Sequence, residues 1–181
     1  MGVALRLWIA CALIGVFAAI IAVGVDVLSL FIYDYRVQLC ETTPGSLPRY
    51  LVWLGSGALT ALGAATLLKV VPAAAGSGLP EVKMALSGIV LFESLSTPTV
   101  LFKPLSLAFA IASSLSIGKE GPFIHCACCV AFLLVNSGWI SFSSLVREQR
   151  ELEALIAACA AGVVCTFGAP IGGVLFSIEI T

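Results

Sequence analysis

The sequence predicts an all-α, polytopic membrane protein with broken helices and half-helices. Of its 181 residues, 60% are hydrophobic and only 10% are charged, and the mean hydropathy is +1.13, far above the range of soluble domains. Short Gly/Pro breaks at residues 76–80, 118–122 and 168–173 each precede an apolar stretch. Four charge-free runs are each long enough to cross about 30 Å of hydrocarbon. These runs are Leu7–Val25, Tyr50–Leu68, Gly121–Val146 and Ala154–Ile178.

The first two predicted helices flank a polar loop. The first covers about Val3–Tyr33 and is long enough to cross the bilayer at a tilt. Asp26 lies within it, so this carboxylate should face protein or an interface rather than lipid. Residues 34–49 carry mixed charge and a Thr-Pro-Gly-Ser turn, which predicts a loop. The second helix is expected over about Arg49–Val71, where small residues offer a face for close packing.

The remaining elements are arranged around the breaks. Pro80–Phe92 is too short and too charged to span a membrane, so it is predicted to be a half-helix. Spanning helices are expected over Pro98–Ile117 and Pro122–Asn136, on either side of the second break. A polar connection, Ser137–Arg150, leads to a helix over Glu151–Phe167, in which small residues again favour tight helix contacts.

The last helix has scarcely begun where the sequence stops at Thr181, so we interpret residues 1–181 as one partial transmembrane domain of something larger. The first apolar run is longer than that of a signal peptide and predicts a retained helix.

Charge and cysteine content exclude several classes of function. The net charge of −1 provides no basic face for nucleic acid. Six of the seven cysteines lie in apolar runs, where cysteine packs as a small hydrophobic residue, and Cys40 is expected in the polar loop. We expect no metal and no cofactor. The sequence shows no pair of a nucleophile and a base that would indicate an enzyme.

The three breaks have a chemical consequence in a membrane. Lipid offers no partners to their free backbone N–H groups, so protein or a water-filled cavity must surround them. Helices that begin inside the bilayer direct their positive ends inward, and several such ends around one point bind an anion. Ser77, between two glycines, can offer a hydroxyl and open backbone amides to an unhydrated anion. This arrangement favours anion transport.

Glu120 is a carboxylate within apolar sequence at the start of a helix, where an anion would itself be stabilised. Such a group can block an anion path while ionised and leave it when protonated or displaced. The alternative is a helix-capping carboxylate paired with Lys119. The residues alone leave both interpretations open.

Together, the breaks resemble the signatures of the CLC family of chloride channels and chloride/proton exchangers. The matching stretches are Gly76-Ser77-Gly78-Leu79-Pro80-Glu81, Gly118-Lys119-Glu120-Gly121-Pro122-Phe123-Ile124-His125 and Gly168-Ala169-Pro170-Ile171-Gly172-Gly173-Val174-Leu175-Phe176-Ser177-Ile178-Glu179. The resemblance extends over nearly the whole chain and corresponds to the first inverted repeat of the family's membrane domain. It implies a homodimer in the bilayer with a separate chloride pore in each full-length subunit. The second repeat and the CBS domains of eukaryotic members are not among these 181 residues.

The resemblance also implies roles for individual residues. Ser77 would coordinate the central chloride, Glu120 would be the gating glutamate, and amides around Gly118–Gly121 would line the pore. The implied chloride-binding group is Ser77, Gly78, Gly118, Lys119 and Gly121. The implied supporting residues are Gly76, Pro80, Pro122, Gly168, Pro170 and Glu179.

Two positions discriminate within the family. Ser77 favours chloride, because plant-type nitrate exchangers similar to this family carry proline there. Exchangers hold a proton-accepting acid just after the glutamate that matches Glu179, and this sequence has Ile180 instead. The chain therefore resembles passive, voltage-gated chloride channels of animal plasma membranes. Two alternatives stay open: a chloride/proton antiporter, and a truncated, non-conducting subunit that pairs with full-length partners.

Overall fold

The computed structural model describes residues 3–89, 92–137 and 144–180, and all regular secondary structure in these ranges is helical. The elements are α1 (Val3–Glu41), α2 (Ser46–Val70), the short 3-10 turn η1 (Pro72–Ala74), α3 (Leu79–Leu86), α4 (Thr97–Ala112), α5 (Glu120–Asn136), α6 (Ser144–Phe167) and α7 (Pro170–Ile180). The predicted all-α class is confirmed. The connection expected over Ser137–Arg150 is wrong in its extent, because α6 already begins at Ser144 instead of Glu151; residues 138–143 lie outside the described residues.

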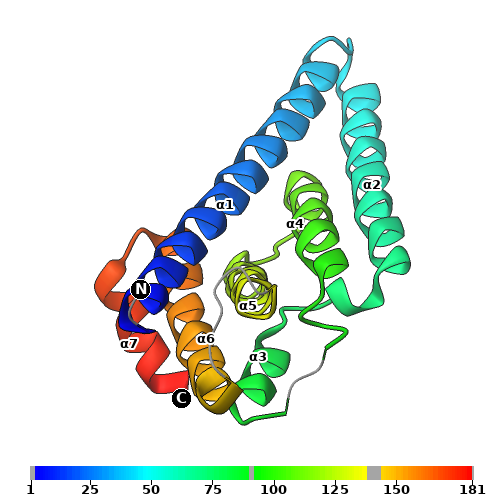
Figure 1. Ribbon diagram of the computed structural model, residues 1–181. Helices are drawn as coiled ribbons and strands as arrows, with labels where there is room; N and C mark the ends of the chain where they lie inside the picture. The colour runs from blue at the N-terminus through cyan, green and yellow to red at the C-terminus, as the bar shows by residue number, and fades with distance from the viewer. Residues whose placement is uncertain (1–2, 90–91, 138–143, 181) are drawn as a thin grey trace.

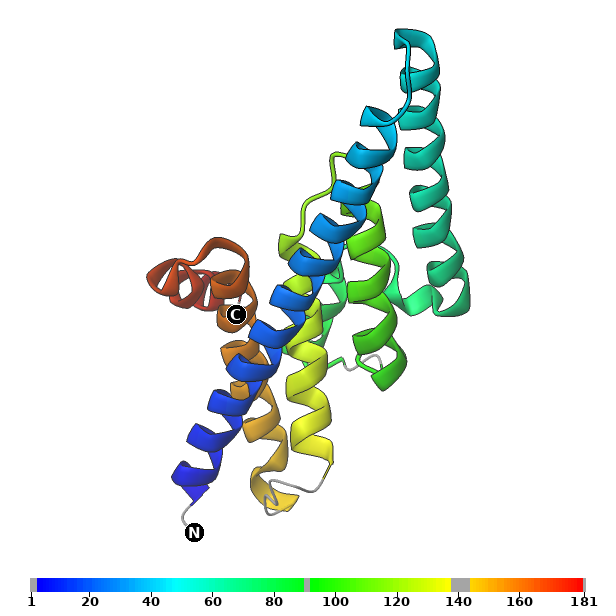
Figure 2. The same ribbon diagram turned by 90° about the horizontal axis from the view of Figure 1, so that it is seen from above.

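The long helix α1 forms one wall of the molecule. Helix α1 extends along nearly the whole length of the molecule, and α2 runs back beside the C-terminal part of α1 (Figure 1). Along its course α1 contacts α4, α5 and α6. A second view shows α4 and α5 next to each other on one side of α1. Helix α7 lies on the opposite side, where it packs on α6 (Figure 2).

The loop predicted over residues 34–49 is wrong in its extent. Helix α1 continues to Glu41, and only residues 42–45 connect it to α2. The helix ends where the hydroxyls of Thr42 and Thr43 donate hydrogen bonds of 3.0 and 2.9 Å to the carbonyl oxygen of Leu39. The polar residues before this point are therefore helical, and Cys40 is a buried residue of α1 rather than a loop residue.

Helix α5 lies at the centre of the molecule. Its residues from Gly121 to Phe132 are all buried, and it packs against α1, α3, α4 and above all α6. A helix that is apolar on all sides is a core helix. A pair of cysteines illustrates this packing between α5 and α6. The Sγ atoms of Cys128 on α5 and Cys159 on α6 lie 3.6 Å apart, and both residues are free thiols.

Only two of the four predicted membrane-length runs form continuous helices of that length among the described residues. α1 and α2 qualify, with mean hydropathies of 2.6 and 1.7 in their most apolar windows. The run Gly121–Val146 is interrupted because α5 ends at Asn136. The run Ala154–Ile178 is divided between α6 and α7 at Gly168, whose φ of +64° turns the chain. Helix α4 likewise stops at Ala112, short of the predicted Ile117.

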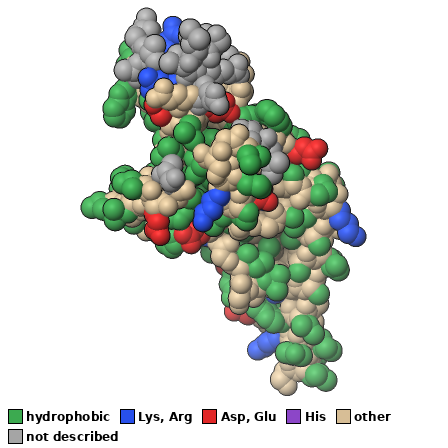
Figure 3. Space-filling model, turned by 90° about the horizontal axis from the view of Figure 1, so that it is seen from below, with side chains coloured by type: hydrophobic (Ala, Val, Ile, Leu, Met, Phe, Trp, Pro, Cys, Tyr) green, Lys and Arg blue, Asp and Glu red, His purple; other side chains and the backbone are tan. Residues whose placement is uncertain are grey.

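Large apolar side chains cover much of the outer surface. Trp8 on α1 and Ile171 on α7, for example, are 74% and 78% exposed. In the space-filling view, hydrophobic side chains spread over much of the visible face, with charged side chains between them (Figure 3). Such a surface is suited to contact with lipid or with further protein rather than with water.

Small residues allow the tight helix contacts that the sequence predicts. On α6, a Cβ atom added to Gly162 would lie 2.5 Å from the Cα atom of Ile124 on α5. On α2, Gly63 faces the ring of Phe109 on α4. The first contact joins the central helix to its main neighbour through the backbone itself.

We expect Gly162→Ala to lower the stability of the folded chain by about 1–3 kcal/mol, because the new methyl group overlaps backbone atoms that cannot rotate away. Gly55→Ala on α2 is the matched control, since a Cβ atom there meets nothing within 4 Å, and its higher helix propensity should leave stability equal or raised. Thermal unfolding of both variants in detergent, followed by circular dichroism, measures the difference. Equal midpoints would mean that the α5–α6 contact adjusts freely.

Candidate functional site

A cavity of about 540 Å³ lies where the first and second breaks meet. The first break contributes Gly76 and Ser77, and the second contributes Gly118 and Glu120–Pro122. Side chains of α2 and α4 complete its wall. The structure thus brings together two segments that are far apart in the sequence, as their helix-start chemistry predicts.

Ser77 lies directly against the start of α5. A Cβ atom at Gly121 would be 2.7 Å from the Cβ atom of Ser77 and 3.1 Å from its carbonyl oxygen, so no side chain fits at residue 121. The Ser77 hydroxyl accepts a long hydrogen bond of 3.4 Å from the amide of Leu79. Its oxygen is exposed and keeps most of its bonding capacity for another partner.

The N-cap residues of α3 and α5 offer no side chain to their own helix starts. The N-cap residues, Gly78 and Lys119, make no side-chain hydrogen bond to their helices. The first amides of a helix have no partners within the helix and carry a partial positive charge. Two such helix starts beside one cavity give it the electrostatic character of an anion site.

Gly78 itself is buried behind Ser77 and does not line the cavity. Its φ is +81°, a conformation that favours glycine. A Cβ atom there would overlap the ring of His125 on α5. Gly78 therefore fixes the position of Ser77 relative to α5.

Lys119 points away from the cavity. Its Nζ atom lies 2.8 and 3.1 Å from the two carboxylate oxygens of Asp26 on α1, which confirms that Asp26 faces protein. Lys119 thus does not pair with Glu120. Across residues 3–89, 92–137 and 144–180, no hydrogen bond or ion pair involves the Glu120 carboxylate, which lies half-buried in the cavity wall.

Lys103 is a cavity residue that the sequence analysis did not identify. It lies on α4, is 2% exposed, and donates a hydrogen bond of 3.2 Å from Nζ to the carbonyl oxygen of Ala74. A lysine inside an apolar run is costly to bury and therefore signals a site. The lysine within an apolar run is visible in the sequence, but no neighbouring motif indicates that Lys103 lies beside the Gly/Pro breaks.

The third break does not join the cavity, so the expected convergence of three helix starts is wrong for the described residues. Gly168 and Pro170 are exposed, and neither lines the cavity. Helix α7 packs on α6, where a Cβ atom at Gly173 would lie 2.7 Å from the carbonyl oxygen of Ala160. α6 thus separates α7 from α5. Glu179 is exposed on α7, and Ile180 packs against the core.

Comparison with known proteins identifies the family. The family model described as voltage gated chloride channel matches residues 57–181. The chain belongs to this family. Chloride channel protein clh-3 of Caenorhabditis elegans is 41% identical over 181 residues, covering 98% of this chain and 18% of that protein. Chloride channel protein 2 of Homo sapiens is 36% identical over 184 residues, covering 96% of this chain and 20% of that protein.

A solved member of the family shares the fold. A crystal structure of a eukaryotic CLC transporter superposes with a TM-score of 0.86 at 34% identity, over 97% of this chain and 33% of that chain. The resemblance to the CLC family is therefore confirmed, and the helices form part of a CLC-type membrane fold. The chain spans about a fifth of the length of the curated relatives it matches.

Proposed function

We propose that this chain is the first inverted repeat of a voltage-gated-type chloride channel that conducts chloride passively. Ser77 coordinates the central chloride and Glu120 is its gate. The observation that carries the proposal is the contact between Ser77 and Gly121, which puts the serine hydroxyl, the start of α5 and the Glu120 carboxylate around one cavity.

The charges around the cavity support this assignment. The helix starts of α3 and α5 each contribute about half a positive charge, and the buried ammonium group of Lys103 adds a full one. Glu120 is the negative group in this wall, and it lies where an incoming anion would be stabilised. A chloride ion and an ionised Glu120 therefore compete for the same positive surroundings, so neutralising or displacing the carboxylate opens the path.

We expect Ser77→Ala to weaken selection of chloride over nitrate in the complete protein that contains this chain. The hydroxyl is the side-chain donor that the first break offers to an unhydrated ion, and a hydrogen bond to a charged partner contributes about 1.5–3 kcal/mol. Reversal potentials in mixed chloride and nitrate solutions measure the permeability ratio. Ser96→Ala, outside the cavity, is the control. A permeability ratio unchanged by Ser77→Ala would exclude Ser77 from selectivity.

Passive transport is favoured over proton-coupled exchange by Ile180. An isoleucine cannot accept a proton at the position where exchangers resembling this family hold an acid, and Glu179 on the exposed face of α7 is the acid beside it. Both branches share this fold, since the solved neighbour is a transporter. We expect the reversal potential of the complete protein to follow the chloride gradient alone. A shift with a proton gradient at fixed chloride would identify the antiporter alternative.

The remaining assignments follow from the same proposal. We place the complete protein in the plasma membrane as a homodimer, with chloride as its substrate, no cofactor and no enzymatic activity. Liposomes that contain only the 181-residue chain should show no chloride efflux, because one repeat supplies only part of the pore wall. The truncated-subunit alternative is distinguished by co-expression, since a subunit that pairs with full-length partners should change their chloride current.

A further inference from the structure

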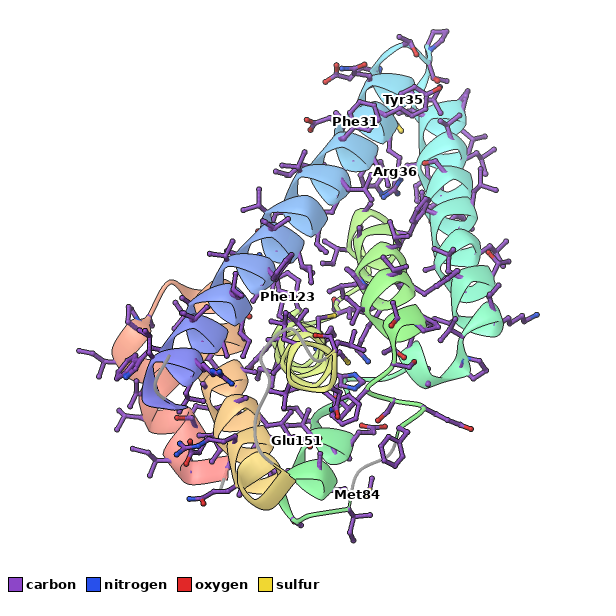
Figure 4. All side chains as sticks on the ribbon, viewed as in Figure 1. Phe31, Tyr35, Arg36, Met84, Phe123 and Glu151 are labelled. Carbon is purple, nitrogen blue, oxygen red and sulfur yellow. The ribbon has the colours of Figure 1, made fainter. Side chains whose placement is uncertain are left out.

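Arg36 is a buried cation of α1 in the stretch that the sequence assigned to a loop. It is only 3% exposed, and its side chain extends from α1 into the space between α2 and the nearby end of α4 (Figure 4). Its guanidinium carbon lies 4.4 Å from the centre of the Trp53 ring, a cation–π contact with α2. None of the described carboxylates pairs with it.

The partners of Arg36 are instead oxygen atoms on two other elements. Nη1 donates to the carbonyl oxygen of Ala112 and, at 3.2 Å, to the hydroxyl of Ser114. On α2, Nη2 donates to the Trp53 carbonyl oxygen and Nε to the Ser56 hydroxyl, each at 3.3 Å. One planar group thus ties α1 to α2 and to the end of α4, which is a use of the guanidinium that lysine cannot reproduce.

The α4 contact has an electrostatic reason. Ala112 is the last residue of α4, and the carbonyl groups at a helix C-terminus carry about half a negative charge that a cation stabilises. α2 makes room for this cation at Gly57, where a Cβ atom would lie 2.8 Å from Nη2 of Arg36. Arg36 therefore acts as a cap for α4 supplied by a different helix.

The segment that Arg36 caps leads directly to Glu120. Residues 113–119 connect α4 to α5, and Ser114 near their start has a φ of +67°. At the other end of this segment, Lys119 is held by Asp26. Arg36 and Asp26 both belong to α1, about 15 Å apart along the helix at 1.5 Å per residue. A single helix thus holds both ends of the connection.

We propose that Arg36 is a positioning residue for Glu120: by holding Ala112 and Ser114, it keeps the 113–119 connection in the conformation that places the Glu120 carboxylate in the cavity. The inference rests on the proposed function, because it takes Glu120 as the gate. Without Arg36 the connection relaxes and the carboxylate leaves the cavity more readily. The ratio of open to closed channels should then rise about tenfold, the effect of losing one hydrogen bond to a charged group.

Patch-clamp recording of the complete protein that contains this chain tests the proposal. Arg36→Met keeps the apolar stem against Trp53 and removes the charge and the donors, so it should raise the open-to-closed ratio about tenfold at a fixed voltage. Arg36→Lys restores the charge and should reverse part of this rise. Arg49→Met is the matched control, because Arg49 is exposed near the same end of α2 and its side chain donates only a long hydrogen bond of 3.5 Å, among the described residues, to the nearby Thr43 carbonyl oxygen. It should gate like the parent protein.

A role through Glu120 is separated from a general structural role by combining substitutions. In a Glu120→Ala background, Arg36→Met should leave the current unchanged, and an effect as large as in the parent would overturn the proposal. If Arg36→Met does not reach the membrane, Ser114→Ala decides. This substitution of an exposed residue removes one acceptor of Arg36 and should also raise the ratio of open to closed channels, and parental gating would refute the inference. If Arg36→Met gates like the parent protein while Glu120→Ala loses gating, the inference about Arg36 is refuted and the proposed function stands. If the parent protein carries no chloride current, the proposed function is refuted as well.

Discussion

Glu120→Gln in the complete protein is expected to give a chloride current that no longer depends on voltage or external pH. Glutamine keeps the size of the side chain in the cavity wall but cannot ionise. It therefore neither competes with chloride for the positive surroundings of α3, α5 and Lys103 nor responds to protons. Whole-cell currents recorded over a range of voltages, at neutral and acidic external pH, measure the loss of both dependences.

Glu41→Gln is the control for this prediction. Glu41 is exposed at the end of α1, so neutralising it changes the net charge equally without touching the cavity. Its currents should depend on voltage and pH as those of the parent do. Parental gating in Glu120→Gln would show that the carboxylate is a helix cap and not a gate.

Lys103→Met is expected to lower the apparent affinity for chloride by more than tenfold. The buried ammonium group is a full positive charge in the cavity wall, and a unit charge about 8 Å from an anion contributes about 2 kcal/mol at an effective dielectric constant of about 20. Lys103→Arg should keep most of this affinity, because it keeps the charge. The chloride concentration that gives half-maximal conductance is the measurement.

The matched control for Lys103 is Lys69→Met, which removes an exposed lysine in the last turn of α2. Its conductance should saturate at the parental chloride concentration. If Lys103→Met also saturates there while the protein remains folded, the Lys103 bond to Ala74 serves only to hold α4 against η1.

The sequence predicted those parts of the site that depend on local backbone chemistry. Glycine and proline mark where a helix can begin with its amides free, so the starts of α3 and α5 were located to within two residues of their positions. The adjacency of Ser77 and Glu120 followed from the idea that such helix ends meet at one point. For two of the three breaks, that idea is confirmed.

What the sequence could not reveal depends on contacts between distant segments. Arg36 was assigned to a loop because charge in apolar sequence usually marks water, yet carbonyl and hydroxyl oxygens of two other helices satisfy it. Lys103 was not identified as a site residue, because its partner Ala74 is 29 positions away in the sequence. The third break obeys the same local rules as the others, and only the packing of α7 on α6 shows that it lies elsewhere.

The double contact between the first break and α5 limits how the proposed gate, Glu120, can move. Gly121 lies on Ser77, and the His125 ring fills the place of a side chain on Gly78, so α5 can neither slide nor turn about its axis without displacing the serine. Ser77 and the start of α5 are thus packed as one unit. If Glu120 is the gate, as proposed, this arrangement favours opening by rotation of its side chain over movement of the whole helix, and such rotation takes picoseconds to nanoseconds for an exposed side chain. The slow step is the arrival of the proton or chloride ion that releases it, so opening rates should report on ion occupancy rather than on helix motion.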